Sequence, residues 1–157
     1  MKLLWVALAV LALLAILSSL LSVAKAKKAA ITAKPVMSEA ELQLYRRLRT
    51  AAPSLSVFPQ VALSQLLKCD DHTRKNSFRQ LVADFVICDR SAKALLVIEL
   101  DDKTHNKPSQ KERDARKDSA LTEAGIKVVR WRVGKVPPDD KIAAILAEVA
   151  KPEEPTV

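Results

Sequence analysis

The sequence predicts one domain of the α/β class, at its border with α+β, in which helices flank a mixed β-sheet. Three short apolar runs rich in β-branched and aromatic residues follow one another between residues 54 and 102, and such runs are typical of strands. A helical segment then leads to a fourth strand and a closing helix. Hairpins make neighbouring strands antiparallel, whereas a helical crossover makes them parallel, so we expect a mixed sheet.

The chain begins with an apolar segment, Leu3 to Val23, that contains no charged residue. As a helix it is about 32 Å long at ~1.5 Å per residue, close to the thickness of the hydrocarbon core of a bilayer. Four lysines follow it within residues 25–34, and the positive-inside rule then places the C-terminal side in the cytoplasm. We therefore expect residues 1–24 to be a single-pass anchor that spans a bacterial-type inner membrane through residues 3–23, with a cytoplasmic domain.

A cleaved secretory signal is the alternative for the same segment. Ala24-Lys25-Ala26 resembles a small-x-small cleavage site and Lys2 is a minimal basic start, so cleavage near Ala26 would release a secreted protein. However, the apolar run is longer than the ~7 to 15 residues of a signal peptide, and lysines directly after the site oppose translocation. These two features favour the anchor.

The domain predicted after the anchor starts with a helix. Ser38 and Glu41 form a capping box, in which the side chain of each satisfies the backbone N–H of the other, and apolar residues follow at helical spacing. Residues 25–37 are rich in alanine and lysine without apolar periodicity, which predicts a basic juxtamembrane linker. We expect the domain over residues 38–150, before a short flexible tail (151–157).

The remaining elements follow from polarity and from turn residues. Residues 54–63 predict a strand that carries Pro59 at an edge or a bulge, and the polar stretch after it predicts a loop. Two apolar runs around Asp89-Arg90-Ser91-Ala92 predict a hairpin. A helix ending at Gly125, an alternating strand and an amphipathic helix complete the domain. The expected bounds, from the loop onward, are 68–77, 81–89, 93–102, 109–125, 126–133 and 141–150.

Composition narrows the functions to consider. The formal net charge is +8, but the first 30 residues hold four of the 26 basic residues and none of the 18 acidic ones. The rest is only mildly basic, so a partner must be inferred from a local site. The chain has only two glycines, which excludes a Gly-rich nucleotide-binding loop. Cys69 and His72 have the spacing of half a zinc site, with Cys88 as a third candidate, but a fourth ligand is not evident.

Three acidic side chains meet in the predicted hairpin. Glu99 and Asp101 share one face of their strand because side chains alternate, and pairing through the turn places Asp84 opposite Glu99. Two carboxylates about 5 Å apart repel by about 3 kcal/mol at an effective dielectric constant of ~20, and a hard cation offsets this repulsion. We therefore predict a Mg²⁺ or Mn²⁺ site held by Asp84, Glu99 and Asp101, suited to metal-assisted attack on a phosphodiester. The alternative is a solvated set of acids that pair with arginines.

The stretches VADFVICD and LLVIELDDKTH resemble the catalytic hairpin of the PD-(D/E)XK, or restriction-endonuclease-like, nuclease superfamily. Together with SEAELQLYRRL, VFPQVAL and KERDARKDSALTEAGIKVVRW, they resemble the domain of unknown function 2726 family over about residues 37–133. The resemblance implies a restriction-endonuclease-like fold with an αβββαβ core, in which Asp84 and Glu99 hold metal. Asp101 takes the position of the superfamily's lysine, and there it would be a third ligand or a base.

The pattern Glu-x-Asp, followed four residues later by His, is similar to the very-short-patch-repair type of endonuclease. That resemblance implies that His105 assists proton transfer and that Glu41, on the first helix, assists at the site. A surface loop is the plain alternative for His105, and the capping box is the plain alternative for Glu41. Gln60 and Arg130 would orient water or phosphate, although a solvated strand face also explains both.

Basic residues follow the predicted site and would contact a phosphate backbone, which makes binding salt-dependent. They are Lys103, Lys107, Lys111, Arg113, Arg116 and Lys117. An ordinary charged helix surface explains them equally well. The sequence thus predicts a Mg²⁺-dependent nuclease of DNA or RNA. A non-catalytic module that binds nucleic acid or a protein partner at the membrane is the alternative.

Overall fold

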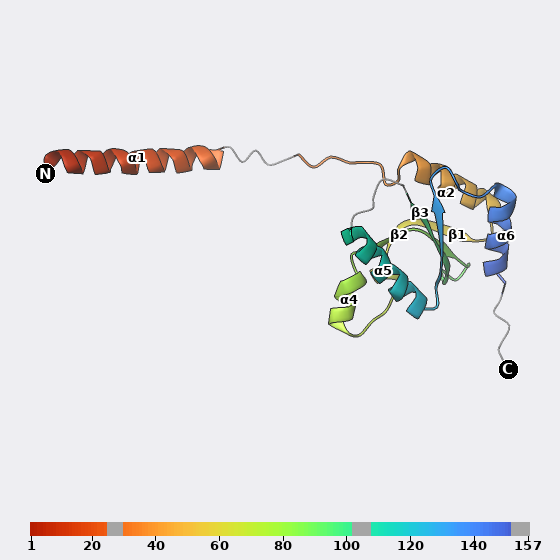
Figure 1. Cartoon of the computed structure of the whole chain (residues 1–157). Coiled ribbons are helices and arrows are strands. Elements are labelled where there is room, and N and C mark those ends of the chain that lie inside the picture. Colours follow the sequence, from red (N-terminus) through yellow and green to blue (C-terminus); the bar gives the residue numbers. More distant parts are fainter. Residues whose placement is uncertain (25–29, 102–107, 152–157) are drawn as a thin grey trace. The chain divides into compact units, whose positions relative to one another are not determined.

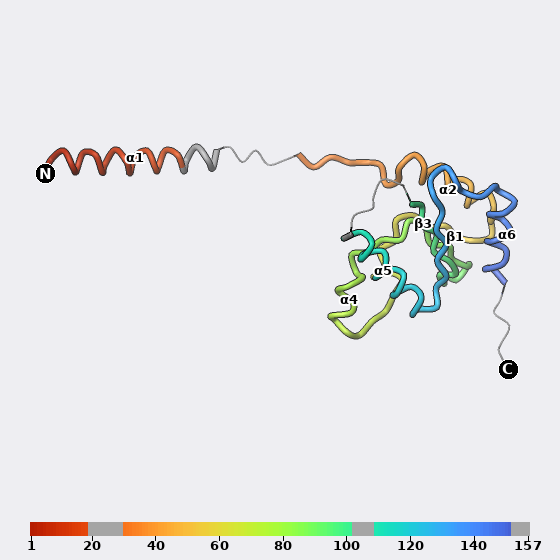
Figure 2. Tube along the Cα trace, in the orientation of Figure 1, coloured from red at the N-terminus to blue at the C-terminus, as the bar shows by residue number. Residues whose placement is uncertain are grey.

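The computed structural model describes residues 1–24, 30–101 and 108–151, with residues 19–24 and 108 described by their backbone alone. The chain divides into two compact units, Met1–Lys34 and Pro35–Val157. The second unit contains the sheet, as the ribbon of Figure 1 and the tube of Figure 2 show.

The first unit contains α1 (Lys2–Ala24), whose described side chains are exposed. The expected single-pass anchor in the inner membrane is wrong, because the described residues include no helix both long and apolar enough to cross a bilayer. The cytoplasmic placement was inferred from that anchor and loses its basis with it.

A four-stranded mixed sheet forms the centre of the second unit, in the order β1-β2-β3-β4. The strands are β1 (Ser56–Ala62), β2 (Val82–Cys88), β3 (Ala94–Asp101) and β4 (Lys127–Arg132). β2 is antiparallel to both β1 and β3, whereas β3 and β4 are parallel. The predicted hairpin, helical crossover and mixed sheet are therefore confirmed. β1 is an edge strand, where Pro59 is tolerated.

Helices cover both faces of this sheet (Figure 1). They are α2 (Glu39–Ala51) and α6 (Asp139–Val149) on one face, and α3 (Leu63–Leu66), α4 (His72–Phe78) and α5 (Pro108–Glu123) on the other. Phe85 and Ile98 pack in the core under α2 and α6. Val86 packs in the core under α5 with Leu121. Neighbouring residues of one strand enter opposite cores because side chains alternate across a sheet.

The predicted signals at two helix ends are present. Ser38 Oγ accepts a hydrogen bond from Glu41 N at 3.3 Å, and Glu41 Oε2 accepts one from Ser38 N at 2.6 Å, which completes the capping box. Gly125 follows α5 with a φ of 73°, in the left-handed region that glycine adopts at little cost.

The prediction of a loop over residues 68–77 is wrong from His72 onward, because α4 begins there. Asp71 Oδ1 caps this helix by accepting a hydrogen bond from Arg74 N at 2.8 Å. Phe78 then buries its ring in the core under α5. A short helix held by one cap and one apolar residue shows no periodicity that would predict it.

Candidate functional site

Two of the three acids predicted at the hairpin lie on the α5 face of the sheet. Val97 packs in the core under α5, and side chains two residues apart on a strand share a face, so Glu99 and Asp101 lie there together with Val97. Ala83 and Val86 also both pack in that core, so the alternation of β2 is interrupted between them, beside Asp84.

The β2–β3 ladder ends beside Asp84. Its pairs run to Phe85 opposite Ile98, and continuing this register places Asp84 opposite Glu99. At this point Asp84 Oδ2 accepts a hydrogen bond from Leu100 N at 2.8 Å. The Asp84 side chain thus accepts the hydrogen bond that a backbone carbonyl of the neighbouring strand would accept in a regular ladder. This hydrogen bond fixes the Asp84 carboxylate at the end of the ladder.

Glu99 is buried against a lysine of α5. The two residues, Glu99 and Lys117, are 3% and 8% exposed. Lys117 Nζ donates a hydrogen bond to Glu99 Oε2 at 2.6 Å, whereas Glu99 Oε1 is buried without a hydrogen-bond partner in the described part of the chain. An oxygen left in this state costs about 1–3 kcal/mol of desolvation unless another group binds it.

The pKa values of Glu99 and of the half-buried Asp84 are both raised. Burial raises the pKa of Glu99 to about 7; Lys117 opposes the rise and the charge of Asp84 adds to it. Burial also raises the pKa of Asp84, against the hydrogen bond from Leu100 and the charge of Lys117. A site where carboxylates resist ionisation attracts a further positive charge.

Asp101 turns toward an arginine of the neighbouring strand. Arg130 Nη1 lies 3.5 Å from Asp101 Oδ1, and Arg130 Nη2 lies 2.6 Å from Asp118 Oδ1 on α5. In the ranges that the structure describes, no three His, Cys, Asp or Glu side chains lie close enough together to hold a metal ion. Asp101 nevertheless lies close enough to Asp84 for its negative charge to raise the pKa of that carboxyl.

The two cysteines of the alternative zinc site contact the same core, in which Cys88 is buried and against which Cys69 packs. Cys88 is buried in the core under α5. Cys69 is partly exposed, and its Sγ donates a hydrogen bond to Asp71 O at 3.6 Å. Both cysteines are free thiols.

Glu41 and Gln60 approach Asp84 from α2 and β1. Gln60 Nε2 donates a hydrogen bond to Glu41 Oε1 at 2.9 Å. The pairs on either side of Gln60 in the β1–β2 ladder put it across from Asp84, and its φ of 53° departs from a regular strand. The charge of Glu41 raises the pKa of Asp84. Glu41 thus lies near the acids while it caps α2, so its two predicted roles are compatible.

The basic residues predicted to bind phosphate fall into three groups. Lys103 and Lys107 lie outside the described residues, and so does His105. The exposed cations of α5 are Lys111, Arg113 and Arg116. Lys117 differs from these because it is buried against Glu99.

The sequence did not predict two ion pairs of the site, Lys117 with Glu99 and Arg130 with Asp118. Lys117 precedes the buried Leu121 by four residues, and such residues lie on the same side of a helix. This spacing is the signal that places Lys117 on the inner face of α5. Nothing in the sequence selects Asp118 over Asp101 as the nearer partner of Arg130.

The fold and the site define a mixed α/β domain with a buried acid–lysine pair and a second acid beside it. The chain belongs to the family described as "Protein of unknown function (DUF2726)", whose model matches residues 33–149.

Two relatives are similar to the chain. The uncharacterized protein y4bI of Sinorhizobium fredii is 26% identical over 131 residues, which cover 81% of this chain and 95% of the relative. An uncharacterized protein of Haemophilus influenzae is 29% identical over 97 residues, 59% of this chain and 51% of the relative, so the chain spans about half of it. No solved structure matches. The resemblance to the nuclease superfamily and to very-short-patch-repair endonucleases stays a prediction.

Proposed function

We propose that the domain is a metal-dependent nuclease that hydrolyses phosphodiester bonds of DNA or RNA. The observation that carries the proposal is the Glu99 Oε1 atom, which is buried near Asp84, lacks a hydrogen-bond partner among the described residues and belongs to the carboxylate that binds Lys117. Acids and an ammonium gathered at the end of a strand ladder have the charges needed to bind a cation and a phosphate.

Asp84 and Glu99 fit a hard divalent cation. Mg²⁺ usually takes one or two carboxylates and completes its shell with water and substrate oxygens, and Glu99 Oε1 would gain the partner that it lacks. When bound, Mg²⁺ or Mn²⁺ would supply positive charge to the scissile phosphate. Asp101, whose Oδ1 atom lies 3.5 Å from Arg130 Nη1, would add a third carboxylate.

Residues of the chain itself prepare the site for a phosphate. Leu100 N holds Asp84, and Lys117 holds Glu99. Lys117 also brings to this face of the sheet the positive charge that the resemblance assigns to a lysine at position 101. An ammonium there can bind a non-bridging phosphate oxygen. Glu41 and Gln60 would orient water, and His105 keeps its predicted role in proton transfer.

The test is metal-dependent cleavage by the purified full chain. Labelled single-stranded and double-stranded DNA and RNA are each incubated with Mg²⁺, Mn²⁺ or EDTA. We expect cleavage only with metal, and a loss of roughly 100-fold or more in Asp84→Asn, the size expected when a charge is removed from an active site. Asparagine keeps an acceptor for Leu100 N, so this variant should still fold. Asp140→Asn, at an exposed position of α6, is the matched control. No cleavage of any substrate would refute the proposal.

The alternative function is binding without catalysis, and two observations favour it. Glu99 already has a cationic partner in Lys117, and Asp101 stands where the resemblance expects lysine. A non-cleaving module would show salt-sensitive binding to nucleic acid that persists in Asp84→Ala and Glu99→Ala. Binding to a protein partner alone would leave nucleic acid unbound in the same assay.

A further inference from the structure

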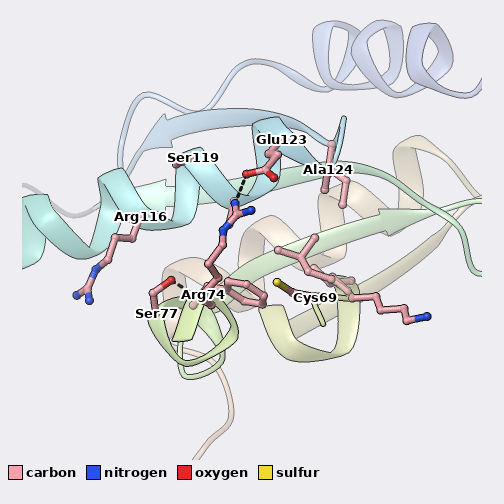
Figure 3. A pocket seen from close by; sticks show the side chains of 13 residues that line it. Cys69, Arg74, Ser77, Arg116, Ser119, Glu123 and Ala124 are labelled. Carbon is pink, nitrogen blue, oxygen red and sulfur yellow. Dashed lines mark hydrogen bonds and ion pairs between the residues drawn. The ribbon is translucent and has the colours of Figure 1, made fainter. Parts of the chain in front are cut away.

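A cavity of about 420 Å³ lies between α4, α5 and the segment that joins α3 to α4 (Figure 3). Its volume is within the ~300–1,000 Å³ typical of small-ligand sites. Asp84, Glu99 and Lys117 do not line it. The cavity is therefore distinct from the carboxylate site.

The wall of this cavity is apolar on one part and cationic on another. Its apolar residues are Leu66, Leu67, Phe78, Ala120, Ala124 and Ile126. Lys68, Arg74 and Arg116 contribute positive charges, against Glu123 as the acid of the described lining. Such a wall suits a ligand with a flat, weakly polar body and a negative group.

Arg74 presents a planar cation inside the cavity. Its Nη2 atom lies 2.5 Å from Glu123 Oε2, and Figure 3 shows the side chain extending across the cavity toward this carboxylate. A guanidinium plane held in this way can stack on a nucleic-acid base. The hydroxyl groups of Ser77 and Ser119, which also line the cavity, can bond to the edge of a base.

Consecutive residues of α5 serve the cavity and the carboxylate site. Arg116 lines the cavity, whereas Lys117 binds Glu99. Their Cα atoms are about 3.8 Å apart, as in any trans peptide. Because consecutive side chains of a helix point about 100° apart, a nucleic-acid strand would pass around this turn of α5 to contact both Arg116 and Lys117.

We propose that the cavity binds one unpaired base of a single-stranded nucleic acid, stacked on Arg74, with the adjoining phosphate on Arg116. The inference rests on the proposed nuclease function, which places the next phosphate at the carboxylate site. A base inside a duplex would have to leave the stack before it entered a concave site. The substrate class is therefore single-stranded or unpaired nucleic acid.

The experiment measures binding by fluorescence anisotropy with the full chain in EDTA, where the metal-dependent reaction is off. The probes are a short single strand, the same strand without bases, and the corresponding duplex. Because stacking of one base is worth about 1–3 kcal/mol, we expect the normal strand to bind at least about fivefold more tightly than the abasic strand. Its affinity should also exceed that of the duplex.

Ala124→Trp fills the cavity from an exposed position and should remove this preference. Ala115→Trp places the same side chain on an exposed part of α5 outside the cavity and should preserve it. Arg74→Gln should weaken binding of the normal strand, whereas its matched control Lys75→Gln, outside the lining, should not.

Three outcomes would overturn the inference: equal affinity for normal and abasic strands, an unchanged preference in Ala124→Trp, or no measurable binding of the single strand. The cleavage assay separates the two proposals. A cavity-dependent preference without metal-dependent cleavage refutes the nuclease alone. Cleavage without that preference refutes the base-binding cavity alone.

Discussion

At the scale of single residues, the burial of the Glu99–Lys117 pair has a desolvation cost. The side chains are only 4% and 11% exposed, so both charges lose most of their hydration. The attraction between two buried opposite charges offsets this desolvation cost but seldom exceeds it. A buried ion pair therefore contributes little net stability to a fold. Its presence beside a second acid fits a binding role better than a purely structural one.

Lys117→Met should lower the free energy of unfolding by about 3 kcal/mol at neutral pH, because it leaves the buried Glu99 without its cationic partner. This value is near the lower end of the range for broken buried pairs, since Glu99 can become neutral by binding a proton. Adding Glu99→Gln to this variant should restore part of the loss. Urea denaturation measures both effects. A change below about 1 kcal/mol in the single variant would contradict this account.

The raised pKa of Glu99 predicts how the free energy of unfolding of the domain depends on pH. Its pKa is raised from 4.5 to about 7 in the folded domain, so the folded state binds the proton more tightly than the unfolded state. The resulting stabilisation is fully present below the unfolded pKa and is lost as pH rises through about 7, by up to about 3 kcal/mol.

In metal-free buffer, Glu99→Gln should flatten this part of the stability profile. Denaturation midpoints measured at several pH values between the unfolded and folded pKa of Glu99 provide the check. If the variant and the original chain lose stability in parallel over this window, Glu99 is not the group responsible. Asp84, whose pKa is raised in the same direction, would then be the next group to test.

At the scale of elements, α2 and α5 each serve two parts of the molecule. Glu41 caps α2 through Oε2 and binds Gln60 of β1 through Oε1, so one carboxylate joins a helix start to an edge strand. α5 presents Lys117 to the sheet and Arg116 to the cavity. The position of each helix on the sheet therefore sets the geometry of the site.

Ser38→Ala should destabilise the domain by about 1 kcal/mol, because Glu41 N loses the side chain that caps it. Thermal denaturation measures the change. Ser54→Ala, at an exposed position before β1, is the matched control and should stay within about 0.5 kcal/mol of the original chain. Equal effects of the two substitutions would show that the cap contributes nothing specific.

At the scale of the whole molecule, the two cores take all their described residues from Pro35–Val157. A chain of residues 35–157 should therefore unfold in one cooperative transition, with a midpoint within a few degrees of that of the full chain. Calorimetry of the two chains provides the comparison. Loss of the transition in the shorter chain would show that residues 1–34 contribute to folding.

Local patterns predicted much of this architecture. Alternation and turn residues predicted the hairpin, and its register places Phe85 opposite Ile98. The Ser38–Glu41 spacing predicted a capping box that the structure contains. By contrast, α4 was missed because its stability depends on burying Phe78 in a core assembled from distant segments. The expected membrane span was also wrong, since no helix in the described part of the chain is both long and apolar enough to cross a bilayer.

The sequence by itself determined the four strands, the helices α2, α5 and α6, and the common face of Glu99 and Asp101 on β3, because the periods of 2 and 3.6 residues are local properties of the backbone. Only the tertiary structure decided which cation meets which acid. Lys117 pairs with Glu99 at a separation of 18 residues, and Arg130 lies nearer to Asp118 than to Asp101. Many basic residues carry the same charge, so the choice among them depends on how α5 packs on the sheet.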